Sequence, residues 1–491
     1  MIERTRRAQA GQLTIDPVDE AVASALDGLS SLGAADLATR TRLLTGLADA
    51  IDDDAGNLID LAATETHLSD ERLSGELART SRQLRFYAQV AEDGAQLGVA
   101  IDHADSPSGC DLRMMKVPLG PVAVFAAGNF PFAFGVLGTD TASALAASCS
   151  VVVKAHPGHP RLSQAFAKLA AGVFDSLGFP TGVVGLVEGF DAGLRLVQHR
   201  DVRAVSFTGS LAGGRALFDM VAARPDPIPF YGEMGSLNPV FVLPGAALAR
   251  GEQIGQGFVT SFTSSAGQLC TKPGVLFVPR TSQMIENLGQ PLAAIADHRL
   301  LNEATAQKYE ERLADIKDIA GVKVLGDDRD ANAASDGTPP TLLKISLERF
   351  LASLDTLGEE CFGPASMVVE YDTLDELVGV ARQLPGQLTA AVHAEFEEHE
   401  SARPLVAELI NRVGRLVWNG WPTGLPVAWA TQHGGPYPAA TVPGATSVGA
   451  RALDRFLRPV AFQDVPAALL PGPLVGEKSD HIHRRVDGIP K

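Results

Sequence analysis

A regular alternation of short apolar runs with longer amphipathic segments, between residues 117 and 229, constrains the fold of this chain more than any other feature. Each apolar run has the length of a buried strand, and each following segment has the apolar spacing of a helix. The predicted strands are 122–125, 150–154, 182–187 and 202–208, and the predicted helices are 139–148, 161–177, 191–198 and 211–223. This repeated order predicts an α/β fold in which helices cover a parallel sheet.

A second set of strands and helices follows a proline-rich break at residues 225–229. Its predicted strands are 240–243, 275–279, 366–370 and 388–392, and its predicted helices are 305–319, 375–384 and 402–413. Because 491 residues exceed the usual size of one hydrophobic core, we expect two or three domains, with a boundary near Pro229. Residues 19–97 have helical spacing, 327–340 read as a polar surface loop, and residues from Gly476 onward are expected to be frayed.

The composition excludes several classes of protein. A net charge of −17 leaves no basic face for nucleic acid. No apolar run approaches the length of about 20 residues that a membrane span needs, and residues 1–11 lack the apolar core of a secretory signal. The four cysteines are scattered without a CxxC pair, which predicts neither a zinc site nor a disulfide framework and favours a reducing, cytoplasmic location.

Cys270 lies among small and polar residues immediately before the predicted strand 275–279. Turn chemistry before a strand places the thiol on a loop, and small neighbours leave room for a ligand. Such a thiol becomes a nucleophile when nearby donors or positive charge stabilise its thiolate. The residues alone leave open the alternative that Cys270 is a small buried hydrophobic residue.

Other candidate residues follow predicted strands. Asn129 lies in a Gly/Pro-bounded loop, as a turn residue or as an amide donor to an oxyanion. Lys154 ends a strand, where α/β proteins bind ligands, although a surface lysine fits the pattern as well. Glu233 lies between glycines that allow close approach of a ligand, or it is simply solvated.

The turn at Gly209 and Ser210 links a strand to a helix N-terminus and predicts a phosphate site, although the GxGxxG fingerprint is absent. Arg79 is spaced by three residues from Arg82 and Arg85 along a predicted helix. These arginines either form a solvent-exposed face of the helix or supply a cation that binds a substrate carboxylate. His156 has no thiol or carboxylate neighbour, so no metal site is expected there.

Six motifs occur in an order that resembles the NAD(P)-dependent aldehyde dehydrogenase superfamily over nearly the whole chain. They are 128–131 (GNFP), 152–154 (VVK), 207–210 (FTGS), 232–235 (GEMG), 267–270 (GQLC) and 359–364 (EECFGP). Four further motifs are similar to the α-ketoglutarate semialdehyde (2,5-dioxovalerate) dehydrogenases and to the related NADP-preferring fatty-aldehyde dehydrogenase: 154–157 (KAHP), 421–424 (WPTG), 432–436 (QHGGP) and 455–460 (RFLRPV).

The resemblance implies two Rossmann-like parallel-sheet domains and a small strand extension used in oligomerisation. The cofactor-binding domain would comprise residues 1–98 and 117–229, and the catalytic domain residues 230–440. The extension would comprise residues 99–116 and 441–475, in a homodimer or homotetramer.

The resemblance also implies a role for each site residue. Cys270 would attack the aldehyde, Asn129 and the Cys270 N–H would hold the oxyanion, and Glu233 would activate the hydrolytic water. No metal takes part. The implied cofactor-binding residues are Lys154, His156, Gly209, Ser210, Glu360 and Phe362. Arg79 would bind a substrate carboxylate.

The expected reaction is oxidation of an aldehyde to a carboxylate with NADP or NAD, with α-ketoglutarate semialdehyde as the expected substrate. NADP is favoured, because Pro157 stands where many NAD-specific relatives carry a glutamate. The alternatives are an NADP-preferring dehydrogenase of fatty or other aliphatic aldehydes, a CoA-acylating enzyme and a non-catalytic relative. Glu233 argues against the CoA-acylating enzyme, which typically lacks the base.

Overall fold

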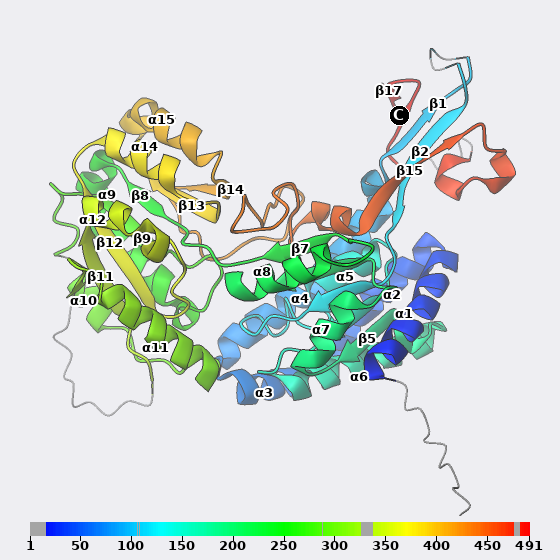
Figure 1. The fold of residues 1–491 in the computed structure, drawn as a ribbon, viewed down its shortest axis with the longest axis horizontal. Helices are drawn as coiled ribbons and strands as arrows, with labels where there is room; N and C mark the ends of the chain where they lie inside the picture. The colour runs from blue at the N-terminus through cyan, green and yellow to red at the C-terminus, as the bar shows by residue number, and fades with distance from the viewer. Residues whose placement is uncertain (1–15, 106, 108, 287, 326–336, 476–481) are drawn as a thin grey trace, which may run out of the picture.

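The computed structural model describes residues 16–105, 107, 109–286, 288–325, 337–475 and 482–491. Within these residues the strands form three sheets (Figure 1). Residues 1–11, discussed above as lacking a secretory signal, and most of the expected loop 327–340 lie outside the described residues. None of the described helices is long and apolar enough to cross a membrane.

The chain begins with long amphipathic helices that pack against the first sheet. They are α1 (Pro17–Ala34), α2 (Leu37–Asp53), α3 (Ala55–Thr66) and α4 (Asp70–Asp93). Ser69 caps α4 through a hydrogen bond from the Arg72 N–H, and Gly94 ends the helix in the left-handed region at φ 75°. These caps fix where α4 begins and ends, and α4 carries several residues of the site described below.

The first sheet is parallel throughout and has the strand order β5-β4-β3-β6-β7. Its strands are β3 (Val122–Phe125), β4 (Val151–Lys154), β5 (Val184–Val187), β6 (Ala204–Thr208) and β7 (Phe230–Glu233), and its helices are α5 (Thr139–Ala146), α6 (Pro160–Leu177), α7 (Phe190–Gln198) and α8 (Leu211–Ala222). Val122 and Val124 pack into one core, whereas Ala123 and Phe125 pack into another on the opposite face. Both faces are therefore buried, which explains the nearly continuous apolar strands.

The predicted boundary near Pro229 does not separate the sheets. Strand β7, which follows Pro229, pairs with β6 and completes the first sheet. The strand predicted at 182–187 is also shorter than expected, because residues Thr181–Val183 form a 3₁₀ turn. Residues Ala450–Phe456 also form a 3₁₀ helix.

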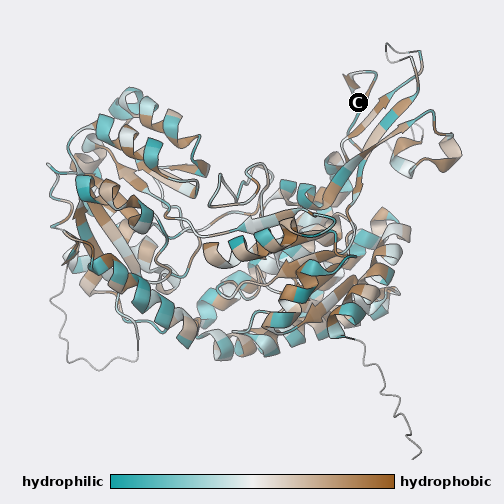
Figure 2. Ribbon diagram, viewed as in Figure 1, coloured by the Kyte–Doolittle hydropathy of each residue, from teal (hydrophilic) through white to brown (hydrophobic). Residues whose placement is uncertain are grey.

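The second sheet has the order β10-β11-β12-β9-β8-β13-β14 and is parallel except for the pairing of β10 with β11. Its strands are β8 (Val240–Val242), β9 (Val275–Pro279), β10 (Lys323–Leu325), β11 (Thr341–Ser346), β12 (Ala365–Tyr371), β13 (Gln387–His393) and β14 (Val413–Trp418). Its helices are α9 (Pro244–Thr263), α10 (Gly289–Ala293), α11 (Glu303–Lys317), α12 (Leu347–Ala352), α13 (Leu354–Leu357), α14 (Leu374–Gln383) and α15 (His399–Leu409). Figure 2 shows hydrophobic strands beneath helices whose outer faces are hydrophilic.

The third sheet projects from the body as an arm (Figure 1). It has the order β15-β2-β1-β16-β17, with β1 (Val99–Asp102), β2 (Leu112–Pro118), β15 (Leu457–Gln463), β16 (Arg484–Val486) and β17 (Ile489–Pro490). The expectation of a frayed C-terminus was wrong for residues 482–491. Strand β16 pairs with β1, and Asp487 accepts a hydrogen bond from the His103 N–H at 2.8 Å.

The chain after β14 returns to the first sheet. Thr441 N–H donates to the Gly232 carbonyl on β7, and Val448 packs against Ala127 and Phe134 in the loop after β3. This return brings residues 432–447 to the end of β7, far from the neighbours they have in the sequence.

Candidate active site

Cys270 lies on a strained loop between α9 and β9. Ser265 and Ala266 adopt positive φ values of 51° and 55°, which non-glycine residues rarely take. Gly267, at φ 66°, has no room for a Cβ, which would overlap the carbonyl of Gly363. The Asn238 amide then donates to the Cys270 carbonyl at 2.9 Å. The backbone around the thiol is thus held from both sides.

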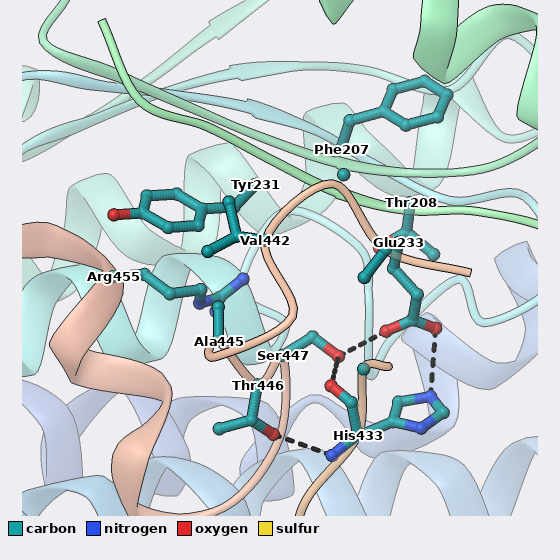
Figure 3. A pocket seen from close by; sticks show the side chains of 13 residues that line it. Phe207, Thr208, Tyr231, Glu233, His433, Val442, Ala445, Thr446, Ser447 and Arg455 are labelled. Carbon is teal, nitrogen blue, oxygen red and sulfur yellow. Dashed lines mark hydrogen bonds and ion pairs between the residues drawn. The ribbon is translucent and has the colours of Figure 1, made fainter. Parts of the chain in front are cut away.

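His433 lies between the Cys270 thiol and Glu233, and Figure 3 shows its contact with Glu233. Its Nε2 lies 3.4 Å from the Cys270 Sγ and 3.0 Å from the Glu233 Oε1. The Ser447 hydroxyl donates to the other Glu233 oxygen, and the His433 N–H donates to the Thr446 hydroxyl at 2.8 Å. His433 is 3% exposed and Glu233 5% exposed, so this cluster is screened from bulk water.

The surroundings shift the pKa values of the thiol and the carboxyl in opposite directions. Burial opposes ionisation of Glu233, but the facing His433 and the Ser447 hydroxyl outweigh it and lower the pKa of that carboxyl. Burial raises the pKa of the Cys270 thiol well above its usual value, and the Glu233 and Glu360 charges add to the rise. The resting site therefore holds a neutral thiol and an ionised carboxylate, with the His433 nitrogen between them.

Asn129 lies beside the cysteine loop. Its Nδ2 donates to the Gln268 carbonyl at 3.0 Å, which leaves its second amide hydrogen for another acceptor. The Arg72 guanidinium contacts the Asn129 carbonyl at 3.4 Å and the Ser265 hydroxyl at 3.1 Å. Asn129 and the cysteine loop are therefore joined both directly and through Arg72.

A cavity of about 780 Å³ opens onto Cys270 and His433. Helix α4 forms one wall with Arg72 and Arg79, and the loop after β3 contributes Phe130 to the lining. A cavity of this size holds a small organic molecule.

Sequence reasoning missed four residues of this region. Arg72 and Glu76 form a 2.5 Å ion pair in which the Glu76 side chain is fully buried, although an Arg and a Glu four residues apart on a helix are usually solvated. His433 was noted only as part of a motif, and Ser447 was not noted. No local sequence signal marks His433 and Ser447, because they reach Glu233 only when the chain folds back onto β7.

Parallel strands bring several predicted cofactor residues to one edge of the first sheet. Lys154 ends β4 and is half-buried, and burial lowers its pKa. Gly209 and Ser210 are exposed at the N-terminus of α8, where the Ser210 hydroxyl caps the helix through the Gly213 N–H. Such a helix end attracts phosphate. His156 stacks on His159, and burial lowers its pKa to about 3, so it is neutral.

Glu360 and Phe362 lie in the loop between α13 and β12. A Cβ on Gly235 would come within 3.0 Å of the Glu360 carboxylate, and Phe362 is half-buried. The Glu360 Oε1 is buried without a hydrogen-bond partner among the described residues. An unsatisfied buried oxygen of this kind suits a hydroxyl donor from a bound molecule. This feature fits a cofactor ribose.

Replacement of Glu360 by glutamine should flatten the pH dependence of stability between pH 4.5 and 7. Burial raises the pKa of the Glu360 carboxyl from 4.5 to about 7. The folded protein then binds this proton more tightly than the unfolded chain does. This tighter proton binding raises the free energy of unfolding by on the order of 3 kcal/mol below pH 4.5, and the gain is lost above pH 7. Urea unfolding of the cofactor-free protein at a series of pH values measures it. Replacement of the exposed neighbour, Glu359→Gln, provides the control. The expectation is contradicted if the free energy of unfolding changes equally with pH in the unmodified protein, in Glu360→Gln and in Glu359→Gln.

The sheets and the cluster of the half-buried Cys270 with the buried His433 and Glu233 define an α/β enzyme with a cysteine at its centre. The chain matches the Aldehyde dehydrogenase family over residues 3–437. It is 41% identical to "Alpha-ketoglutaric semialdehyde dehydrogenase 2" of Azospirillum brasilense over 480 residues, which covers 96% of this chain and 91% of the relative. It is 37% identical to "Alpha-ketoglutaric semialdehyde dehydrogenase" of Acinetobacter baylyi, with 97% and 92% covered.

Solved structures share the fold. The "3,6-anhydro-L-galactose Dehydrogenase in Complex with NAP" has a TM-score of 0.78 at 23% identity and covers 91% of each chain. "Aldehyde Dehydrogenase C (AldC)" from Pseudomonas syringae has a TM-score of 0.76 at 22% identity, with 91% of this chain and 88% of that chain covered. The chain therefore belongs to the aldehyde dehydrogenase family. It is an NAD(P)-dependent enzyme that oxidises an aldehyde to the acid.

Proposed function

We propose that this enzyme oxidises α-ketoglutaric semialdehyde to 2-oxoglutarate and prefers NADP. The observation that carries the substrate is the identity of 41% and 37%, over nearly the whole chain, with two proteins of that name. The geometry around Cys270 supports the reaction, because a thiol, a proton acceptor and a carboxylate lie within 4.8 Å of one another. The cavity beside them is large enough for a five-carbon aldehyde.

Acylation of the enzyme begins at Cys270. Its sulfur attacks the aldehyde carbon, and the thiol proton passes to the His433–Glu233 pair beside it, which holds the proton as a unit because the His433 Nε2 lies 3.4 Å from the sulfur and 3.0 Å from the carboxylate. The free Asn129 amide hydrogen and the Cys270 N–H hold the oxyanion, and a single donor of this kind is worth about 3–4 kcal/mol in acyl-transfer sites. NADP or NAD, when bound, supplies the acceptor for the hydride that leaves the substrate carbon. A thioester on Cys270 remains.

Hydrolysis of the thioester depends on Glu233. A cavity of about 20 Å³, large enough for one water molecule, lies beside Glu233, His433 and Ser447 (Figure 3). Glu233 removes a proton from the water that attacks the thioester carbon, which releases the acid and restores the sulfur. Sulfur, imidazole and carboxylate are also donors that a zinc ion accepts. We assign no metal to them, because a metal would occupy the sulfur lone pair that attacks.

The cofactor residues are assigned by position. Lys154 and Glu360 bind the ribose hydroxyls, while Gly209 and Ser210 present the α8 N-terminus to a phosphate. We assign Phe362 and His156 to contacts with the same cofactor. The turn after β4 supports NADP, because the exposed residue there is Pro157 and not a carboxylate. An adenosine 2′-phosphate meets no fixed negative charge at that point.

An assay of α-ketoglutaric semialdehyde and neutral aliphatic aldehydes with both cofactors tests this function. We expect one NADPH per 2-oxoglutarate and a kcat/KM that is higher with NADP than with NAD. Replacement of Pro157 by glutamate should lower the NADP/NAD ratio about 10–100-fold through like-charge repulsion. Pro157→Gln, which is equally large but neutral, should keep the ratio. A strong preference of the unmodified enzyme for NAD, or for long aliphatic aldehydes, would refute the proposal.

The arm fits an oligomerisation role, and we propose a homodimer or homotetramer in the cytoplasm. Strand β15 ends the order of the third sheet, so one of its edges has no partner strand within the residues that the structure describes. An open strand edge pairs readily with another chain.

A further inference from the structure

The Arg79 side chain lies on the wall of the cavity that contains Cys270 and forms no hydrogen bond or ion pair with any of the described residues. Its Nε is buried, and none of the described residues forms a hydrogen bond or an ion pair with it. Burial lowers the pKa of the guanidinium, because the charged form loses hydration. A buried guanidinium N–H without an acceptor is costly, so this position favours an anionic acceptor that the free protein does not supply.

Arg72, one of the other arginines of the cavity, is satisfied by the protein. Its Nε donates to the Ser265 hydroxyl at 3.1 Å, its Nη1 pairs with Glu76 at 2.5 Å, and its Nη2 contacts the Asn129 carbonyl at 3.4 Å. Arg72 therefore braces α4 against the two loops that surround the thiol. The contrast between two arginines on one helix marks Arg79 as the one that is left for a ligand.

The buried Glu76 favours the charged form of Arg79 but offers it no free oxygen for a hydrogen bond. Both oxygens of Glu76 are occupied, one by the Phe132 and Ala133 N–H groups and the other by Arg72. The Phe130 ring lies 5.9 Å from the Arg79 guanidinium carbon, but an aromatic face offers no in-plane acceptor and this one also lies under Arg72. The other charged residues of the cavity wall, Glu71 and Arg299, are exposed to water at its rim.

We propose that Arg79 binds the carboxylate of the substrate and so selects short aldehydes with an acidic group at the opposite end. This inference rests on the proposed function, since it places the aldehyde at Cys270 and the carboxylate at Arg79 within one cavity. Arg79 and Cys270 both line this cavity of about 780 Å³. A short chain spans such a cavity, and a guanidinium matches a carboxylate in shape.

Kinetics with matched substrates provide the first test. Arg79→Gln should raise KM for α-ketoglutaric semialdehyde and for 4-oxobutanoate about 10–100-fold, the usual effect of losing a charge-assisted hydrogen bond, and change KM for butanal less than about 3-fold. Arg79→Lys should recover part of the affinity for the acids. The exposed Arg82 on the same helix provides the matched control, and Arg82→Gln should leave all three values unchanged.

Protection of Cys270 provides a second test that needs neither cofactor nor turnover. Glutarate or 2-oxoglutarate should slow alkylation of Cys270 by the neutral reagent iodoacetamide in the unmodified protein and in Arg82→Gln, as followed by mass spectrometry of the Cys270 peptide. The protection should disappear in Arg79→Gln. The melting temperature of this variant should be unchanged or higher, because an unpaired buried charge has been removed, whereas a merely structural arginine would lower it.

The two tests separate this inference from the reaction itself. Equal protection of the unmodified protein and Arg79→Gln, or equal KM changes for charged and neutral aldehydes, would overturn the subsite. Failure of α-ketoglutaric semialdehyde as a substrate, with protection by dicarboxylates still dependent on Arg79, would refute the proposed function and keep the subsite.

Discussion

Cys270→Ala should lower kcat/KM for aldehyde oxidation by at least about 10⁴-fold, the scale of losing a catalytic nucleophile. The reason is that, among the described residues that line the cavity, Cys270 supplies the only thiol that can form the bond to the substrate carbon. The loop should keep its shape, because Asn238 holds the Cys270 carbonyl and not the side chain. The glycine and left-handed residues before position 270 are also unaffected by the change.

The measurement follows the nicotinamide absorbance at saturating cofactor, together with the melting temperature of the variant. A similar melting temperature with lost activity separates chemistry from folding. Cys110, between β1 and β2 on the arm, provides the control, and Cys110→Ser should retain full activity. Substantial activity in Cys270→Ala would remove the thioester mechanism altogether.

Glu233→Gln should slow turnover about 10²–10⁴-fold while leaving the first hydride transfer nearly intact. The amide can still accept the hydrogen bond from Ser447 but cannot take a proton from water. Because the facing His433 and Ser447 overcome the effect of burial and lower the pKa of the Glu233 carboxyl, the unmodified enzyme has its base ionised at neutral pH. The thioester should therefore accumulate only in the variant.

Rapid mixing with aldehyde distinguishes the two half-reactions. Glu233→Gln should give a fast burst of about one NADPH per active site and then a slow steady state. His433→Gln should slow the burst itself, since the acceptor 3.4 Å from the thiol is altered. A slow burst in Glu233→Gln, or a fast burst in His433→Gln, would reverse the roles that the geometry assigns to the carboxylate and the imidazole.

Much of the fold could be predicted from periodicity because both faces of the parallel sheets are buried. Strands such as β3 and β4 therefore appear as short apolar runs between helical segments. Strand β7 could not be placed in this way. It follows a proline-rich break, and its membership of the first sheet depends on pairing with β6. Strand β16 was missed because its sequence is polar and its pairing partner, β1, lies far away in the chain.

The sequence by itself determined the alternation of strands and helices and the loop that carries Cys270, because these depend on the local spacing of apolar residues, glycines and prolines. Glu233, in contrast, is the last residue of strand β7, and the pairing of β7 with β6 sets its position. Only the tertiary structure decided which groups surround the thiol. His433 and Ser447 reach Glu233 through hydrogen bonds between distant segments. Arg79 lost its water, and Arg72 gained its partners, only when α4 packed against the loops beside Cys270. Burial and hydrogen bonds of this kind exist only after the chain has folded, and local sequence patterns do not encode them.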